Sequence, residues 1–185
     1  AGSLAPAANE SMPPNSNFGL AMVKLFVAGI GAFLLANETG LGRLGRWFVG
    51  LSFPFSGFVV VWLQYPMAGV AVFLPLVLWL VERLSLRPCP RRAGCLALVL
   101  TILLLGGHPE TAAHILVLAG IYLLWRTSQE RGRMKCLRNA AKDVPAGRFA
   151  RMIGIARDLI ADHAARYFAV ACLVSFLAAA VQLVP

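Results

Sequence analysis

Apolar residues in this chain form long continuous blocks, separated by shorter polar or charged stretches. Six such segments can be drawn along the 185 residues. They span residues 18–36, 47–63, 68–81, 93–107, 111–125 and 164–184. A membrane-spanning helix needs about 20 apolar residues, whereas the strands of a membrane β-barrel alternate apolar and polar positions. The pattern therefore predicts an all-α fold, a polytopic transmembrane helical bundle of about six spans.

The six segments differ in length. The first, second and sixth are long enough for a full span, and the third, fourth and fifth are shorter. The fourth and fifth would each rise about 22 Å, which is less than the roughly 30 Å of the hydrocarbon core. Either the corner between these two segments lies below the membrane surface, or arginines at their other ends extend toward the headgroups.

Composition agrees with a membrane protein. The chain is 59% hydrophobic and 14% charged, with a mean hydropathy of +0.74. An ordinary soluble domain is roughly 45–50% apolar and about 25% charged. The composition therefore excludes an ordinary soluble domain.

The basic residues alternate from one connection to the next. All but one of the 17 Lys and Arg residues lie between the first and second segments, between the third and fourth, or between and beside the fifth and sixth. The turns "QYP" and "GGHPE" and the head of the chain have none. Because basic loops stay in the cytoplasm, both chain ends and both of these turns are expected to face outward, away from the cytoplasm. Basic loops beside anionic lipid explain the net charge of +9, so no nucleic-acid partner is expected.

The same pattern divides the chain into four parts. These are an outward-facing loop (1–17), a five-helix membrane segment with the GGHPE turn (18–125), a basic cytoplasmic loop with an amphipathic helix (126–163) and the sixth span (164–185). Because the chain begins with Ala rather than Met and ends as an apolar run finishes, we expect it to be an internal piece of a longer protein.

The amphipathic helix of the basic loop begins near Phe149. Its apolar residues follow i, i+3, i+4 spacing as far as Tyr167, and Asp162 with Arg166 makes a favourable i, i+4 pair. We interpret it as an interfacial helix that leads into the last span. A docking site for a partner is the alternative.

The stretch "GGHPETAAH" holds the most distinctive polar residues. A purely structural interpretation is available. The two glycines can end a helix, and Pro109 suits the first position of the next one. The carboxylate of Glu110 would then be stabilised by the positive N-terminal end of that helix. His108 would lie near the cap. The alternative is a site, since a sunken His and Glu are costly unless they line a wet cavity or pair with each other. Glu110 and His114 share a helix face.

Three other polar residues are candidates for such a site. Lys24 lies inside the first span and needs a partner or water, unless it extends to the surface. Gln64 and Tyr65 lie in the outward turn "WLQYP", where an interfacial aromatic belt is the alternative explanation. No zinc signature is present, because "HPETAAH" is not H-E-x-x-H; a divalent ion at Glu110 and His114 stays open.

The chain resembles the YfhO-like family of bacterial multi-pass membrane proteins. The pieces that carry the resemblance are "LLLGGHPETAAHILVL", "LSFPFSGFVVVWLQYP", "FLPLVLWLVERL" and "AAAVQLVP". That family is similar in architecture to the C-type glycosyltransferases. The resemblance implies transfer of a sugar from a polyprenyl-phosphate donor to an envelope polymer or lipid acceptor at the outer face of the bacterial cytoplasmic membrane. In that superfamily an acid in the first outward loop activates the acceptor, and only Glu10 remains of such a loop here.

The residues suggest a chemistry for such a transfer. His108 and Glu110 are the candidate catalytic residues, with Glu110 as the base for the acceptor hydroxyl or as the group that orients the imidazole. His108, His114 or Lys24 would stabilise the departing phosphate, and Gln64 and Tyr65 would bind substrate. A lipid or sugar carrier and a scaffold without chemistry are the alternatives.

Overall fold

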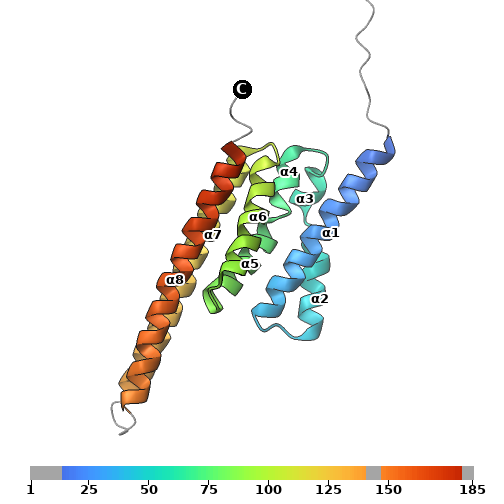
Figure 1. Cartoon of the computed structure of the whole chain (residues 1–185). Helices are drawn as coiled ribbons and strands as arrows, with labels where there is room; N and C mark the ends of the chain where they lie inside the picture. Colours follow the sequence, from blue (N-terminus) through green and yellow to red (C-terminus); the bar gives the residue numbers. More distant parts are fainter. Residues whose placement is uncertain (1–13, 141–146, 181–185) are drawn as a thin grey trace, which may run out of the picture.

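The computed structural model describes the backbone of residues 14–140 and 147–180, and the side chains of residues 18–129 and 162–180. Within these ranges every regular element is an α-helix (Figure 1). The helices are α1 (Pro14–Glu38), α2 (Arg43–Ser52), α3 (Gly57–Val61), α4 (Pro66–Ala71), α5 (Leu74–Leu86), α6 (Pro90–Leu105), α7 (Pro109–Ala140) and α8 (Gly147–Ala180). The predicted all-α class is confirmed.

The chain runs back and forth between two ends of the bundle (Figure 1). Its passes are α1, then α2 with α3, then α4 with α5, and then α6, α7 and α8 singly. We call the end with the α3–α4 and α6–α7 connections the turn end. We call the end with the α1–α2 and α5–α6 connections the arginine end. Connections without basic residues therefore lie opposite the arginine-rich ones, as the alternation along the sequence predicted.

Within the described residues, four segments are long and apolar enough to cross a membrane. They are Phe18–Glu38, Arg43–Val61, Pro66–Leu86 and Asp162–Ala180. The third is longer than expected from the sequence, because the helix continues through Glu82 and Arg83 to Leu86. α6 has 16 residues and would rise about 24 Å, so it is shorter than a typical span, as predicted for the fourth segment.

Two of these spans are interrupted near a proline. α2 ends at Ser52 and α3 begins at Gly57, with Pro54 between them. α4 ends at Ala71 and α5 begins at Leu74, with Pro75 in its first turn. A proline lacks the N–H that a continuous helix needs and clashes with the preceding turn. The second apolar segment, expected to be long enough for a full span, therefore consists of two short helices.

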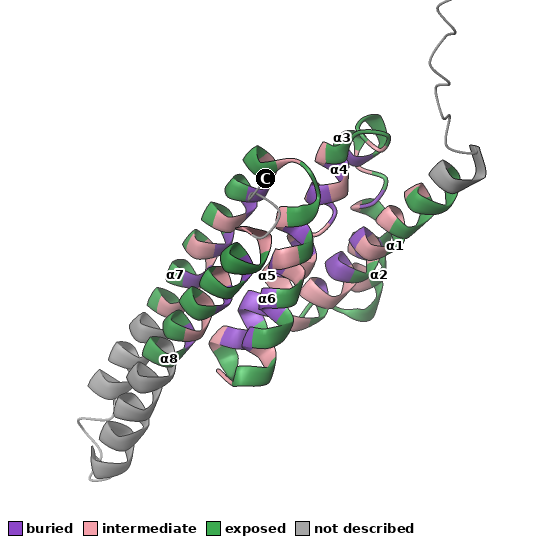
Figure 2. Cartoon of the chain, turned by 45° about the horizontal axis from the view of Figure 1, so that its top comes forward, coloured by how far each residue is buried: buried purple, intermediate pink, exposed green. Residues whose placement is uncertain are grey.

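α5 is the central helix of the bundle. It contacts α1, α6, α7 and α8, and its buried side chains join those of α6 in the main core. That core includes Val77, Leu80, Val81, Leu84, Leu96, Leu100 and Leu103. Figure 2 shows buried residues on the inner faces of α5 and α6 and exposed ones on the outer faces of α1, α7 and α8. Many exposed side chains are large and apolar, such as Phe26 and Leu173, which suits a surface in contact with lipid.

Glycines let α1 approach its neighbours closely. A Cβ on Gly31 would lie 2.9 Å from the backbone nitrogen of Leu76 in α5. A Cβ on Gly29 would lie 3.0 Å from the carbonyl oxygen of Gly50 in α2. Small residues at such crossings are typical of membrane helix packing.

The boundaries of the predicted parts shift at two places. α1 begins at Pro14, inside the region expected to be a loop, and residues 1–13 lie outside the described residues. α7 continues to Ala140 and α8 begins at Gly147, so helix extends far into the basic segment. The amphipathic pattern lies largely outside the described side chains, but the predicted pair between Asp162 and Arg166 is confirmed at 3.2 Å.

Candidate functional site

The α6–α7 turn has a conformation that its two glycines permit. Gly107 has a φ of +80°, in the left-handed region that favours glycine. A Cβ on Gly106 would lie 2.8 Å from Cγ2 of Val70, so this turn packs directly against α4. The turn therefore joins the neighbouring α3–α4 region rather than standing free.

His108 caps the N-terminus of α7. Its Nδ1 accepts a hydrogen bond from the backbone N–H of Thr111 at 3.3 Å and lies 2.7 Å from the Thr111 hydroxyl. A side chain that accepts from the third residue of the helix is an N-cap. Because a backbone N–H can only donate, Nδ1 must accept, and a neutral His108 carries its proton on Nε2. The end of α6 at the glycines, the start of α7 at Pro109 and the position of His108 near the cap are therefore confirmed, and a role for His108 in ligand binding stays a prediction.

Glu110 and His114 follow on the first turns of α7. Both are exposed, and Nδ1 of His114 lies 2.8 Å from the backbone carbonyl oxygen of Glu110. A carbonyl only accepts, so Nδ1 of His114 carries the proton, and Nε2 of the neutral ring is an acceptor. The contact involves the Glu110 backbone rather than its carboxylate. Among the described residues, no group of three or more metal-ligating side chains is assembled.

Lys24 has a partner inside the bundle. Its Nζ donates a hydrogen bond to the carbonyl oxygen of Leu63 at 3.1 Å, and its side chain passes Gly69 of α4. Leu63 directly precedes Gln64 and Tyr65, which are both exposed. Lys24 therefore does not extend freely to the surface but supports the α3–α4 turn.

The predicted site residues thus form two groups at the turn end. Lys24, Gln64 and Tyr65 gather at the α3–α4 turn, and His108, Glu110 and His114 lie on the α6–α7 turn. The contact of Gly106 with Val70 places the second turn against α4. Within the described side chains, no hydrogen bond or ion pair links one group directly to the other.

The sequence analysis missed a buried polar cluster between α5 and α7. Glu82 is 2% exposed, and both its carboxylate oxygens accept from Arg126, with Nε at 2.9 and 3.0 Å and Nη2 at 2.8 Å. The hydroxyl of Tyr122 donates to the same carboxylate at 3.1 Å. An acid inside the apolar run "LWLVERL" was the available signal, because such a residue is costly in a membrane without a partner.

This cluster is a clamp between two helices rather than an open site. Three donor groups satisfy a carboxylate that has almost no solvent contact. A buried ion pair adds little net stability, but removal of one partner leaves an unpaired buried charge and is strongly destabilising. The clamp therefore specifies how α5 and α7 align.

Other arginines at the arginine end also have defined partners. Nε of Arg83 lies 2.9 Å from the Glu38 carboxylate, and its guanidinium stacks 5.2 Å from the Trp79 ring centre. Arg92 donates to the carbonyl oxygens of Arg83 and Arg87 at 2.7 and 2.9 Å. The sequence placed these arginines in basic connections beside anionic lipid, and part of their donor capacity satisfies α1 and the end of α5.

The helical bundle and its four apolar segments are those of a multi-pass α-helical membrane protein. Searches of protein-family models, curated proteins and solved structures found no match to this chain. The resemblance to the YfhO-like family and the site roles that it implies stay predictions.

Proposed function

We propose that this chain is the membrane part of a glycosyltransferase that moves a sugar from a polyprenyl-phosphate donor to a cell-envelope acceptor. The observation that carries the proposal is the position of the candidate residues. Two turns that are more than 40 residues apart in sequence lie at the same end of the bundle, and both carry polar side chains. A donor of this kind would keep its lipid chain along the apolar helix faces and present its phosphate and sugar to these turns.

Each polar group has a role in the proposed transfer. The carboxylate of Glu110 takes the proton of the acceptor hydroxyl as its oxygen bonds to the anomeric carbon. The bond from that carbon to the phosphate oxygen breaks, and the polyprenyl phosphate leaves with the electron pair. The Lys24 ammonium and the Nε2–H of His108 stabilise the negative charge on the leaving phosphate. Gln64, Tyr65 and His114 would orient the sugar.

The capping role of His108 determines which variants test the proposal. His108→Ala removes both the cap and the imidazole. His108→Asn keeps a capping acceptor but removes Nε2–H. A gene deletion would be complemented with wild type, with either variant or with Glu110→Gln, and lipid-linked sugars and envelope glycans would be profiled by mass spectrometry.

We expect one envelope glycan to disappear in the deletion while its lipid-linked donor accumulates. Wild type restores the glycan, whereas Glu110→Gln and both His108 variants do not. Rescue by His108→Asn but not by His108→Ala would show that His108 acts only as the N-cap of α7 and not in the transfer. Unchanged glycans in the deletion strain would reject the transferase, and a donor that accumulates on the wrong side of the membrane would indicate a carrier.

A further inference from the structure

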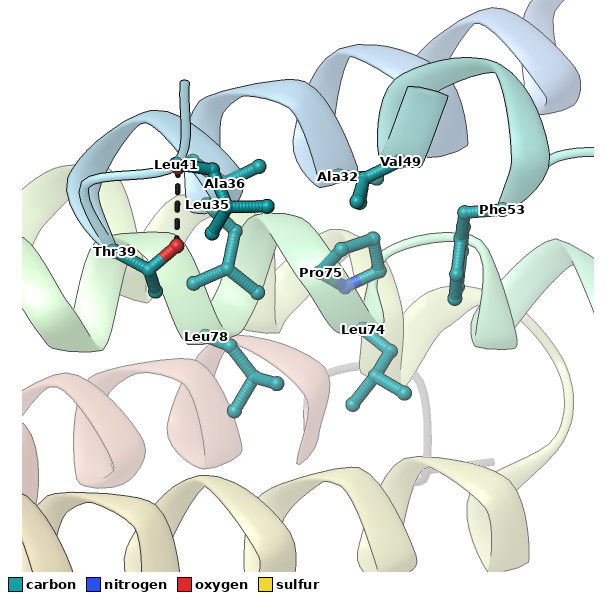
Figure 3. A pocket seen from close by; sticks show the side chains of 10 residues that line it. All are labelled: Ala32, Leu35, Ala36, Thr39, Leu41, Val49, Phe53, Leu74, Pro75 and Leu78. Atoms are coloured by element: carbon teal, nitrogen blue, oxygen red, sulfur yellow. Dashed lines mark hydrogen bonds between the residues drawn. The ribbon is translucent and has the colours of Figure 1, made fainter. Parts of the chain in front are cut away.

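An apolar pocket of about 250 Å³ lies between α1, α2 and α5 (Figure 3). Ten residues line it: Ala32, Leu35, Ala36, Thr39, Leu41, Val49, Phe53, Leu74, Pro75 and Leu78. Thr39 is the polar member, and its hydroxyl donates to the carbonyl oxygen of Ala36 at 3.0 Å (Figure 3). The pocket therefore presents hydrocarbon to whatever enters it.

The two helix interruptions supply part of the pocket wall. Phe53 follows the end of α2, and Leu74 and Pro75 begin α5. Because the α2–α3 span and the α4–α5 span are both interrupted here, α1, α2 and α5 do not pack tightly against one another along this stretch. Leu35 and Val49 are only partly buried, so the pocket opens toward the surroundings, which are hydrocarbon for a protein in a bilayer.

Cationic groups lie at the end of this pocket. Nε of Arg46 donates to the carbonyl oxygen of the lining residue Leu41 at 2.8 Å, and its Nη1 donates to the Asn37 side chain. These bonds fix the guanidinium beside the rim, and the described residues provide no acceptor for its Nη2. Arg83 is on α5, beyond the lining residue Leu78, and its Nε pairs with the carboxylate of Glu38, which directly precedes the lining residue Thr39. Glu38 offsets the charge of Arg83, whereas Arg46 has only neutral partners. Both guanidiniums keep N–H donors for an anion.

We propose that this pocket binds one acyl chain of an anionic phospholipid from the surrounding leaflet, with the lipid phosphate on Arg46 and Arg83. Guanidinium groups match phosphate oxygens in a bidentate geometry, and basic pockets between membrane helices are typical sites for anionic headgroups. The apolar lining alone would accept any acyl chain, so the arginines make the site selective. This site lies at the arginine end, away from the polar turns, and does not depend on the proposed transfer.

The test uses the whole chain purified in detergent. The protein is titrated with phosphatidylglycerol or phosphatidylcholine of identical acyl chains, and the retained lipids are counted by native mass spectrometry. Val49→Trp fills the pocket, and Leu41→Trp narrows it at its exposed rim. Arg46→Gln removes the charge at the rim. Arg43→Gln is the matched control, because Arg43 is exposed on the same helix. Circular dichroism and size-exclusion chromatography confirm that each variant is folded.

We expect wild type to retain one phosphatidylglycerol in preference to phosphatidylcholine. Arg46→Gln should weaken phosphatidylglycerol binding about tenfold, as the loss of one hydrogen bond between charged groups implies, and both tryptophan variants should abolish it. Arg43→Gln should leave it unchanged. Equal binding of the two lipids, equal losses in Arg43→Gln and Arg46→Gln, or full retention in both folded tryptophan variants would overturn the proposal. The proposal would also be overturned if wild type were a dimer and Val49→Trp made it a monomer, because a second copy of the chain would then occupy the pocket.

Discussion

The buried clamp between α5 and α7 gives the sharpest prediction. Replacing Arg126 with Met keeps an unbranched stem but removes the guanidinium, which leaves the Glu82 carboxylate, 2% exposed, without its charged partner. Breaking a buried ion pair in this way costs about 3–5 kcal/mol. The Arg126 side chain is itself 26% exposed, so part of this cost is relieved by solvent, and we expect the lower end of the range.

Replacing both partners should behave differently. In the double variant Glu82→Leu with Arg126→Met no charge is buried, and such exchanges are often neutral or stabilising by about 1–4 kcal/mol. Tyr122→Phe removes only one hydrogen bond, and hydrogen bonds between membrane helices are worth about 0.6 kcal/mol on average. The expected order of stability therefore places the double variant near wild type, Tyr122→Phe slightly below it, and Arg126→Met lowest.

The assay is unfolding in mixed micelles with increasing denaturing detergent, followed by circular dichroism. A double-mutant cycle over Glu82 and Arg126 then gives their coupling energy. The reasoning would be refuted if the double variant were as unstable as Arg126→Met, because the loss would then come from packing rather than from an unpaired charge. A cost below about 1 kcal/mol for Arg126→Met would mean that water reaches the carboxylate.

Three further changes test other parts of the structure. His108→Ala should destabilise the protein by about 1 kcal/mol through loss of the α7 cap, and His108→Asn should not; the same unfolding assay would contradict the capping role if both variants lost equal stability. Gly31→Leu should separate α1 from α5, because a Cβ would already lie 2.9 Å from the Leu76 backbone, and cysteine cross-linking between these helices should then fall; unchanged cross-linking would show that the helices can yield. Gly107→Val should cost roughly 1–2 kcal/mol, because a branched residue is strained at a φ of +80°, and an unchanged midpoint of unfolding would argue against that turn conformation.

Much of the architecture was predictable from the sequence because membrane physics is simple at that level. Solid apolar blocks can only be helices in lipid, and the alternation of arginine-rich and arginine-free connections matches the two ends of the bundle. The cap at "GGHPE" was also readable, because Pro109 and its neighbouring glycines act through local backbone geometry. These features depend on residues that are close together in the chain.

The parts that were missed depend on partners far away in the sequence. Glu82 and Arg83 looked like the start of a loop, and the third segment was therefore drawn too short. Their partners are Arg126 on α7 and Glu38 on α1, so the helix can continue through both charges. Similarly, Lys24 could not be placed until its bond to the Leu63 carbonyl was known. A charge in an apolar run cannot be assigned to a loop or a helix until its tertiary partner is identified.

The separation of Glu82 from Arg126 has a consequence for biogenesis. The two residues are 44 positions apart, so the ribosome makes α5 and α6 before the partner of Glu82 exists. A charged residue at the centre of an isolated membrane helix costs about 2.5–3.5 kcal/mol on insertion. Glu82 lies nearer the end of its span, so α5 bears part of this cost until α7 is synthesised. α5 should therefore remain beside the insertion machinery until α7 arrives. α5, α6 and α7 would then enter the bilayer together, after α7 has been synthesised.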